Sequence, residues 1–395
     1  MKKLILGVAV LAAFFTGCSA SEDQITPSGQ VTGEITGTYT VNKTFASGTY
    51  TLKGIVKVAT GVTLTFDAGS TITCNKTTGD NAFVVLNGGK VVMNGTASQP
   101  IVFTEASGIP GSWGGIIIYG DAPITGAGGL TTLLSEDGNS LNYGGTNSTH
   151  NGGILNYVRV EYAGSKLADG QKENNGFTFY SVGSGTVLSN LVSYKGADDG
   201  FEFFGGTVSM TNAISYGNYD DAFDWQDGWR GQNNSNWYGL QVTKGNYGFE
   251  IESSNINNSF GPIISNITLK RIAGCTPEVA GDIQVDAFQF KREGNGEFSN
   301  IVIEGYGNYV EGTTTYQGAV VKIQDANTNT NQVNASKIKV TNVKISTTTQ
   351  IVPVGATAAI SVSFPAGQFV TGTSATGAML TSGAWSTVGT VNLIQ

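Results

Sequence analysis

The tetrapeptide Gly200-Phe201-Glu202-Phe203 returns 22 residues later as Ala222-Phe223-Asp224-Trp225, and this repeat decides the fold. Each copy places a small residue before two apolar residues that flank a variable one. Further copies are Gly115-Ile116-Ile117-Ile118, Gly176-Phe177-Thr178-Phe179, Gly248-Phe249-Glu250-Ile251 and Ala287-Phe288-Gln289-Phe290. Apolar residues at alternating positions are typical of a β-strand with one buried face, so the sequence predicts a series of similar short strands.

The spacing of the copies predicts a parallel β-helix. Between residues 176 and 248 the copies follow one another at intervals of 24, 22 and 26 residues, and no segment shows helical periodicity. Coils of this length hold about three short strands and stack ~4.8 Å apart, so that equivalent residues form columns. We expect two inward columns, one of Ile116, Phe177, Phe201, Phe223, Phe249 and Phe288 and one of Ile118, Phe179, Phe203, Trp225, Ile251 and Phe290. A β-propeller, which needs repeats of about 40 residues, is the less favoured alternative.

The composition agrees with an all-β protein and excludes several classes. Of 395 residues 56 are Gly, and 21 basic and 29 acidic residues give a net charge of −8. Abundant Gly disfavours long helices, and 39% hydrophobic residues can bury a core, which excludes intrinsic disorder. The shortage of Lys and Arg argues against nucleic acid as a partner.

Residues 1–17 have the features of a lipoprotein signal peptide. Two lysines precede an apolar run, Leu4 to Phe15, that is too short to span a bilayer comfortably. The run leads into Thr16-Gly17-Cys18, which resembles the end of a bacterial lipobox, so we expect cleavage before Cys18 and lipidation of its thiol. Two or three acyl chains anchor a protein stably, whereas one does not. An ordinary secretory signal is the alternative.

Residues 18–33 are expected to form a flexible tether behind the lipid anchor. Ser19 gives no sign of inner-membrane retention, and Glu22 and Asp23 resemble the acidic tether of Bacteroidota-type surface lipoproteins. We therefore expect the protein to be anchored in the cell outer membrane and to face the outside, with the periplasmic face as the alternative.

The β-helix is expected over residues 34–346, with Thr36 to Phe45 as an N-terminal cap. Residues 347–395 contain no Asp, Glu, Lys, Arg or His, and such a segment should not stand alone in solvent. We expect it to be a β-rich cap over the last coil, because the open end of a solenoid invites strand-on-strand aggregation. An interface with another protein is the alternative.

The variable residue between the two inward columns is acidic in the middle of the chain. It is expected to point outward, and down the stack it is Ile117, Thr178, Glu202, Asp224, Glu250 and Gln289. Acids one coil apart would lie ~5 Å from each other, where like charges repel and raise each other's pKa. The turns before the strands add Asp198-Asp199 and Asp220-Asp221, and we expect one exposed acidic patch.

Three interpretations of these acids stay open. In the first, Asp199 and Asp221 accept backbone N–H groups in turns, and the outward acids are merely solvated. In the second, the patch binds Ca²⁺, a hard cation that takes six to eight oxygen ligands, through Asp198, Glu202, Asp220, Asp224 and Glu250. In the third, a pair of carboxyl groups catalyses glycoside hydrolysis; the candidates are Asp198, Glu202 and Asp224.

Aromatic residues beside the acidic column suggest a carbohydrate ligand. Trp229, Arg230, Trp237 and Tyr238 stand in sequence rich in Gly, Gln and Asn, and exposed aromatic rings suit the apolar faces of sugars. The alternative is that both Trp residues pack a long loop against the coil, while Trp225 belongs to the core.

Other reactive residues give weaker signals. Cys74 and Cys275 lie 201 residues apart and are expected to be buried free thiols. His150 has no base partner nearby in the sequence, and no zinc-ligand spacing is present. The run Lys291-Arg292-Glu293 could supply the basic residues of a polysaccharide lyase, but as a short charge run we expect it to be solvated.

The segments around residues 113–124, 153–160, 196–208 and 219–231 resemble Bacteroidota-type envelope lipoproteins with a right-handed parallel β-helix. The resemblance covers roughly residues 50 to 300 and implies an envelope location but no agreed activity. The Asp-Asp pair is shared with the polygalacturonase group, whose Gly-His-Gly and Arg-Ile-Lys motifs are missing here. The Arg-bearing motif of pectate lyases is not recognisable either.

These observations favour a surface lipoprotein that uses a rigid β-helix as a binding scaffold for glycans or for an outer-membrane partner complex. A polysaccharide lyase or glycosidase acting through the acidic face is the first alternative. A structural or adhesive surface protein is the second.

The lipid anchor predicts that Cys18→Ala releases the protein from membranes, because the acyl chains are attached to this thiol. Fractionation of cells and labelling with a fatty-acid probe measure the effect. A mutant that stays in the membrane fraction and still takes up the probe contradicts the prediction.

Overall fold

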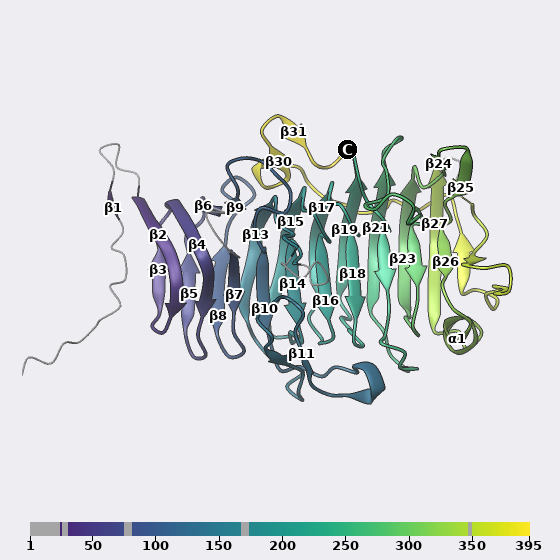
Figure 1. Ribbon diagram of the computed structural model, residues 1–395, viewed down its shortest axis with the longest axis horizontal. Coiled ribbons are helices and arrows are strands. Elements are labelled where there is room, and N and C mark those ends of the chain that lie inside the picture. Colours follow the sequence, from purple (N-terminus) through teal and green to yellow (C-terminus); the bar gives the residue numbers. More distant parts are fainter. Residues whose placement is uncertain (1–23, 26–30, 75–80, 167–173, 347–349) are drawn as a thin grey trace, which may run out of the picture.

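The computed structural model describes residues 24–25, 31–74, 81–166, 174–346 and 350–395. Its strands stack side by side along the long axis of a solenoid (Figure 1). One sheet holds 25 strands, and its pairings are parallel except that of β1 (Gln24–Ile25) with β2 (Val31–Tyr39). The protein is an all-β right-handed parallel β-helix, as predicted.

Two series of strands form the main faces. The first series is β7 (Ala82–Val85), β10 (Ile116–Tyr119), β14 (Phe177–Tyr180), β16 (Phe201–Phe204), β18 (Phe223–Gln226), β20 (Phe249–Ile251), β22 (Phe288–Phe290), β26 (Val321–Ile323) and β28 (Val354–Gly355). The second is β13 (Gly153–Glu161), β15 (Val187–Tyr194), β17 (Met210–Tyr216), β19 (Asn234–Gln241), β21 (Ile263–Arg271), β23 (Gly296–Glu304), β27 (Ile338–Ser346) and β29 (Phe369–Thr371).

The remaining elements are shorter or peripheral. The first coils use β3 (Lys43–Phe45), β4 (Gly48–Val58), β5 (Thr63–Phe66), β6 (Thr71–Cys74), β8 (Lys90–Asn94) and β9 (Ile101–Thr104). Three hairpins project from the coils: β11 (Leu133–Leu134) with β12 (Asn142–Tyr143), β24 (Asn308–Glu311) with β25 (Thr314–Gln317), and β30 (Thr387–Val388) with β31 (Val391–Asn392). Short helical turns are Ala127–Gly129, α1 (Ala326–Thr328), Asn329–Val333 and Ala384–Ser386.

Both predicted inward columns are confirmed in register. Phe201 pairs with Phe177 on one side and with Phe223 on the other, and all three side chains are fully buried. Their ring centroids lie 5.1 and 5.4 Å apart in stacked geometry. Trp225 occupies the second column and is 1% exposed. Gly200 shows why a small residue precedes the repeated apolar positions. A Cβ at this position would lie 2.4 Å from the Ser215 hydroxyl, so little space is available.

An asparagine ladder, which the sequence analysis missed, closes one edge of the coils. Asn190, Asn212, Asn236, Asn266 and Asn300 adopt left-handed backbone angles with φ between 53° and 59°. Each side-chain amide donates to the amide oxygen of the Asn one coil earlier, at distances from 2.7 to 3.1 Å. A Ser or Thr before each Asn and an apolar residue after it are the sequence signal that could have revealed the ladder.

The ends of the solenoid differ from the expected caps. Thr36 to Phe45 already belong to the first coil, since β2 pairs in parallel with β4 and β3 with β5. At the other end, β28 and β29 add strands to the same sheet, beyond the expected boundary at residue 346. Cys18 and most of the expected tether lie outside the described residues, but Gln24–Ile25 and residues 31–33 of that segment belong to the paired strands β1 and β2.

Residues 372–395, which we name the C-terminal strap, run back along the outside of the coils (Figure 1). The strap hydrogen-bonds to the ladder at Asn300 and to Ala97 near the N-terminal end. Trp385 of the strap packs with Tyr194 and Tyr216 in an apolar cluster on the flank. The uncharged C-terminus therefore covers an outer face of the β-helix in addition to the last coil.

Two further observations concern the described residues. Cys74 and Cys275 are buried free thiols, as predicted. Within the described ranges, no helix has the length and apolar character needed to cross a membrane.

The aromatic column predicts that Phe223→Ala lowers the free energy of unfolding by ~3–5 kcal/mol, because it leaves a cavity between stacked rings. Val310→Ala is the control, since Val310 is 60% exposed on the β24–β25 hairpin, and it should cost less than ~1 kcal/mol. Chemical denaturation measures both. Equal losses would contradict the role assigned to the column.

Candidate functional site

The acids predicted to share a column do so. Glu202 on β16 pairs with Asp224 on β18, which pairs with Glu250 on β20, and the column continues to Gln289 and Lys322. The expectation of an exposed patch is wrong: Glu202 is 6% and Asp224 is 8% exposed. The column points away from the aromatic core, but other parts of the chain cover it.

One segment that covers the column is the excursion between β10 and β13, which carries the β11–β12 hairpin (Figure 1). The Tyr119 hydroxyl donates to Asp137 of the excursion at 2.5 Å, and the Tyr143 hydroxyl of the excursion donates to Asp227 at 2.5 Å. These bonds hold the excursion on the coils, and Glu136 beside Asp137 becomes part of the wall over the acids.

The result is a cavity of about 280 Å³, which we name the acidic cavity. Its wall contains nine carboxylates and two cations. They are Glu136, Asp198, Asp199, Glu202, Asp220, Asp221, Asp224, Glu250 and Glu252, with Lys291 and Arg292; Asn175 and Gln226 complete the wall.

Two of these acids have the structural role that the first interpretation gave them. Asp199 accepts the backbone N–H of Asp221 at 2.8 Å, and Asp221 accepts that of Tyr247 at 2.6 Å. Each carboxylate thereby ties its turn to the equivalent turn of the next coil. Asp286 repeats the arrangement with the N–H of Ala319 at 2.8 Å.

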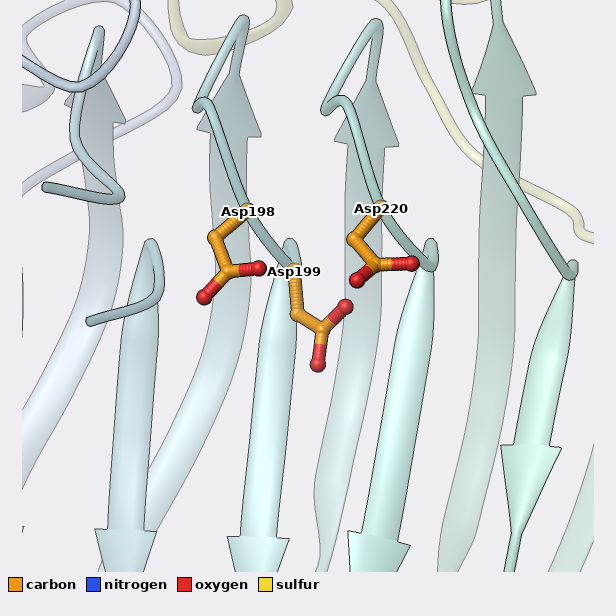
Figure 2. Close-up of side chains that lie close together, drawn as sticks. All are labelled: Asp198, Asp199 and Asp220. Atoms are coloured by element: carbon orange, nitrogen blue, oxygen red, sulfur yellow. The ribbon is translucent and has the colours of Figure 1, made fainter. Parts of the chain in front are cut away.

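The carboxylates approach one another closely at two points. Asp198 and Asp220 stand at equivalent turns of adjacent coils, with the Asp199 carboxylate between them (Figure 2). In this group and in the group of Asp199, Glu202 and Asp224, one oxygen from each residue lies within 4.8 Å of the others. Asp199 belongs to both groups, so the two form one continuous set of carboxylate oxygens.

This environment shifts the titration of the acids. Burial raises the pKa of Asp199, Glu202, Asp221 and Asp224 well above the ordinary value, and neighbouring carboxylates raise each of them further. For Glu202 the main charged neighbour is Glu136, and for Asp224 it is Glu250. The unbound cavity therefore favours bound protons or a bound cation.

Among the described contacts, basic residues pair with acids at one end of the cavity, and the charge of Lys291 there also partly offsets the rise in the pKa of Asp224. Lys291 lies 2.5 Å from Glu250 and 3.5 Å from Glu252, and Arg292 lies 3.1 Å from Glu252. Glu293 is buried and accepts amide N–H groups of Asn331 and Gln332 at 2.6 and 2.7 Å. The prediction that residues 291–293 are solvated is therefore wrong for Lys291 and Glu293, because their partners come from other coils.

At the other end, two buried oxygens have no hydrogen-bond partner. They are Oδ1 of Asp224 and Oδ1 of Asn175, which is 3% exposed. The amide nitrogen of Asn175 donates to Glu202 at 2.5 Å. This bond holds the Asn175 side chain next to the carboxylates. Buried acceptors without a donor are costly, and carboxylate and amide oxygens are the ligands that Ca²⁺ takes.

The aromatic residues predicted to bind a ligand do not face the cavity. Trp229 and Trp237 are 1% and 0% exposed in the core, and their indole N–H groups donate to the Val208 and Met210 carbonyls at 3.0 and 2.9 Å. Tyr238 is buried under the strap, where its hydroxyl donates to the Gln395 carbonyl at 2.6 Å. The expectation of exposed rings is wrong. Burying the apolar surface of a Trp ring stabilises the fold, and this gain does not depend on the polar residues beside it in the sequence.

Arg230 is also placed differently from the expectation. Its guanidinium lies over the Phe260 ring, 3.8 Å from the centroid, and donates to the Pro123 carbonyl at 3.3 Å. It does not line the acidic cavity, so none of the four residues predicted to bind a ligand belongs to that site.

Comparison with known proteins places the chain in a family. A family model described as a pectate-lyase-like β-helix domain matches residues 36–387. The chain belongs to this family. No curated protein matches the sequence significantly. Membership in the pectate-lyase-like family agrees with the parallel β-helix. The matched range includes every residue that lines the acidic cavity.

The raised pKa values predict how stability depends on pH in calcium-free buffer. A carboxyl group whose pKa is higher in the folded state binds more protons there, so its ionisation penalty grows as pH rises above about 4, its ordinary pKa. Lowering the pH from 7.5 to 5.5 should therefore raise the contribution of these groups to stability. Glu202→Gln should raise the Tm at pH 7.5 by at least about 2 °C and reduce its pH dependence.

Glu297→Gln is the matched control, because the Glu297 side chain is 56% exposed on β23. It should leave the Tm and its pH dependence unchanged. A lower Tm for Glu202→Gln than for the wild type at pH 7.5 would contradict the repulsion among the carboxylates.

Proposed function

We propose that the protein is an outer-membrane lipoprotein, facing the outside, whose acidic cavity holds Ca²⁺ and binds a carbohydrate polymer through it. The observation that carries the proposal is the pair of buried oxygens without a hydrogen-bond partner, on Asp224 and Asn175, beside the closely spaced carboxylates of Asp199, Glu202 and Asp224. Buried like charges persist when a cation or protons offset them, and the donor set suits a hard cation.

The structure alters the ligand set expected from sequence. Asp199, Glu202 and Asp224 are the proposed ligands, because their oxygens converge and the Asn175 amide nitrogen donates to Glu202. Asp198 and Asp220 stand next to this group and extend it. Glu250 is left out, since its carboxylate is paired with Lys291. A bound Ca²⁺ would offset the carboxylate charge and offer open coordination positions to sugar hydroxyls.

The envelope location rests on the sequence. The lipobox at Cys18 and the acidic residues after it support an anchor and export to the surface, and the family match begins behind the tether at residue 36. A rigid solenoid on such a tether can present its acidic cavity to glycans outside the cell or to an outer-membrane partner complex.

A second candidate function is glycoside hydrolysis. Its support is the close approach of the Glu202 and Asp224 carboxyl groups, whose raised pKa values favour the protonated form that a general acid needs. A lyase with Lys291 as its base has less support, because the neighbouring carboxylates raise the pKa of Lys291 and hold its proton. Release of reducing sugar ends from a bound polymer separates hydrolysis from binding.

The proposal predicts that Ca²⁺ stabilises the protein and is required for glycan binding. At a concentration a hundredfold above Kd, the ion should raise the free energy of unfolding by about 2.7 kcal/mol. Thermal melts with Ca²⁺ or a chelator, and a glycan array under the same two conditions, measure the two effects.

The double variant Glu202→Gln with Asp224→Asn should lose both responses, whereas Glu297→Gln keeps them. The proposal fails if Ca²⁺ leaves the melting curve unchanged, or if glycans bind equally well in the chelator.

A further inference from the structure

A second hollow of about 690 Å³ lies next to the acidic cavity, and we name it the amide hollow. The two share Glu250, Lys291 and Arg292 as a common wall. The remaining wall of the amide hollow includes Tyr247, which lies just before β20, and Gln289, Lys322, Gln324 and Asp325 from the next coils. Because β20, β22 and β26 pair in succession, the hollow continues the acidic cavity along the axis of the solenoid.

A buried acceptor without a partner is built into this hollow. Gln289 is 4% exposed, and its amide nitrogen donates to the Tyr247 hydroxyl at 2.6 Å and to the Gln324 oxygen at 3.0 Å. Its own oxygen has no partner. These two bonds fix the amide in one orientation. The Gln289 oxygen is left as a buried acceptor, which a hydroxyl donor on a ligand would satisfy.

Each of the three cations that line the hollow is already paired with an acid. Lys291 is paired with Glu250, Arg292 with Glu252 and Lys322 with Asp286, at 2.5, 3.1 and 3.2 Å. Asp282 and Asp325 add negative charge at the wall. A carboxylate on a ligand would compete with Glu250, Glu252 and Asp286 for these cations and would meet the charge of Asp282 and Asp325, whereas a neutral hydroxyl can donate to Gln289 without displacing an ion pair.

We propose that the groove formed by the acidic cavity and the amide hollow selects neutral, hydroxyl-rich polysaccharides over uronate polymers. In this binding mode, sugar hydroxyls donate to Gln289 in the amide hollow. This inference rests on the proposed function, because the same polymer reaches the ion in the acidic cavity. Gln289, held by Tyr247 and Gln324, is the residue that determines specificity.

Binding of matched hexasaccharides in the presence of Ca²⁺ tests the inference. The probes are cellohexaose, xylohexaose and mannohexaose, and hexagalacturonate is the charged counterpart of the same length. Calorimetry should show at least one neutral hexamer binding ten times more tightly than hexagalacturonate, or better. Gln289→Met should weaken that binding at least fivefold without changing the Ca²⁺ affinity.

Two controls keep the mutational result interpretable. Gln317→Met, on the exposed β24–β25 hairpin, removes an amide that lines neither hollow and should bind like the wild type. Gln324→Met removes the exposed amide whose oxygen accepts from Gln289, and it should weaken binding less than Gln289→Met does. This second variant keeps the test valid if Gln289→Met loses stability.

The outcomes separate this inference from the proposed function. Tighter binding of hexagalacturonate than of every neutral hexamer overturns the inference but leaves Ca²⁺-dependent glycan binding in place. Unchanged affinity in both Gln289→Met and Gln324→Met overturns the role of the amide hollow. If none of the four probes binds, both proposals are contradicted.

Discussion

The in-register stacking of parallel coils is the constraint on which the rest of the structure depends. Neighbouring strands stand ~4.8 Å apart, so each side chain meets its counterpart in the next coil. Aromatic counterparts such as Phe201 and Phe223 stack favourably, and Asn counterparts such as Asn212 and Asn236 form hydrogen bonds. Carboxylate counterparts repel, and Glu202, Asp224 and Glu250 occupy three successive positions of one column.

The column resolves this repulsion in two ways along its length. Beyond Asp224, Lys291 reaches Glu250 and Lys322 pairs with Asp286, so protein cations offset the charge. Around Glu202 and Asp224 the described residues supply amides rather than cations, and two oxygens remain without partners. The side chains therefore change along the axis, from the closely spaced carboxylates of the acidic cavity to the amides and paired charges of the amide hollow.

Sequence periodicity was sufficient for the coil register, because alternating apolar residues and the 22- to 26-residue spacing report directly on the strands. It could not give the burial of Glu202 or Thr178, which depends on packing between distant parts of the chain. The same limit explains Trp229 and Trp237, whose polar neighbours in sequence suggested exposure although the rings complete the core. The partners of Lys291 and the path of the strap are likewise contacts between coils, and local patterns do not encode them.

The central claim is that the acidic cavity holds a cation. A crystal structure from crystals grown with CaCl₂, with anomalous scattering to identify the ion, tests this claim most directly. We expect one ion bonded at about 2.3–2.6 Å by Asp199, Glu202 and Asp224, with the Asn175 oxygen among its ligands or joined to it through water. An ordered cavity without an ion at millimolar Ca²⁺, in which the carboxyl groups instead share protons through short hydrogen bonds, would contradict it.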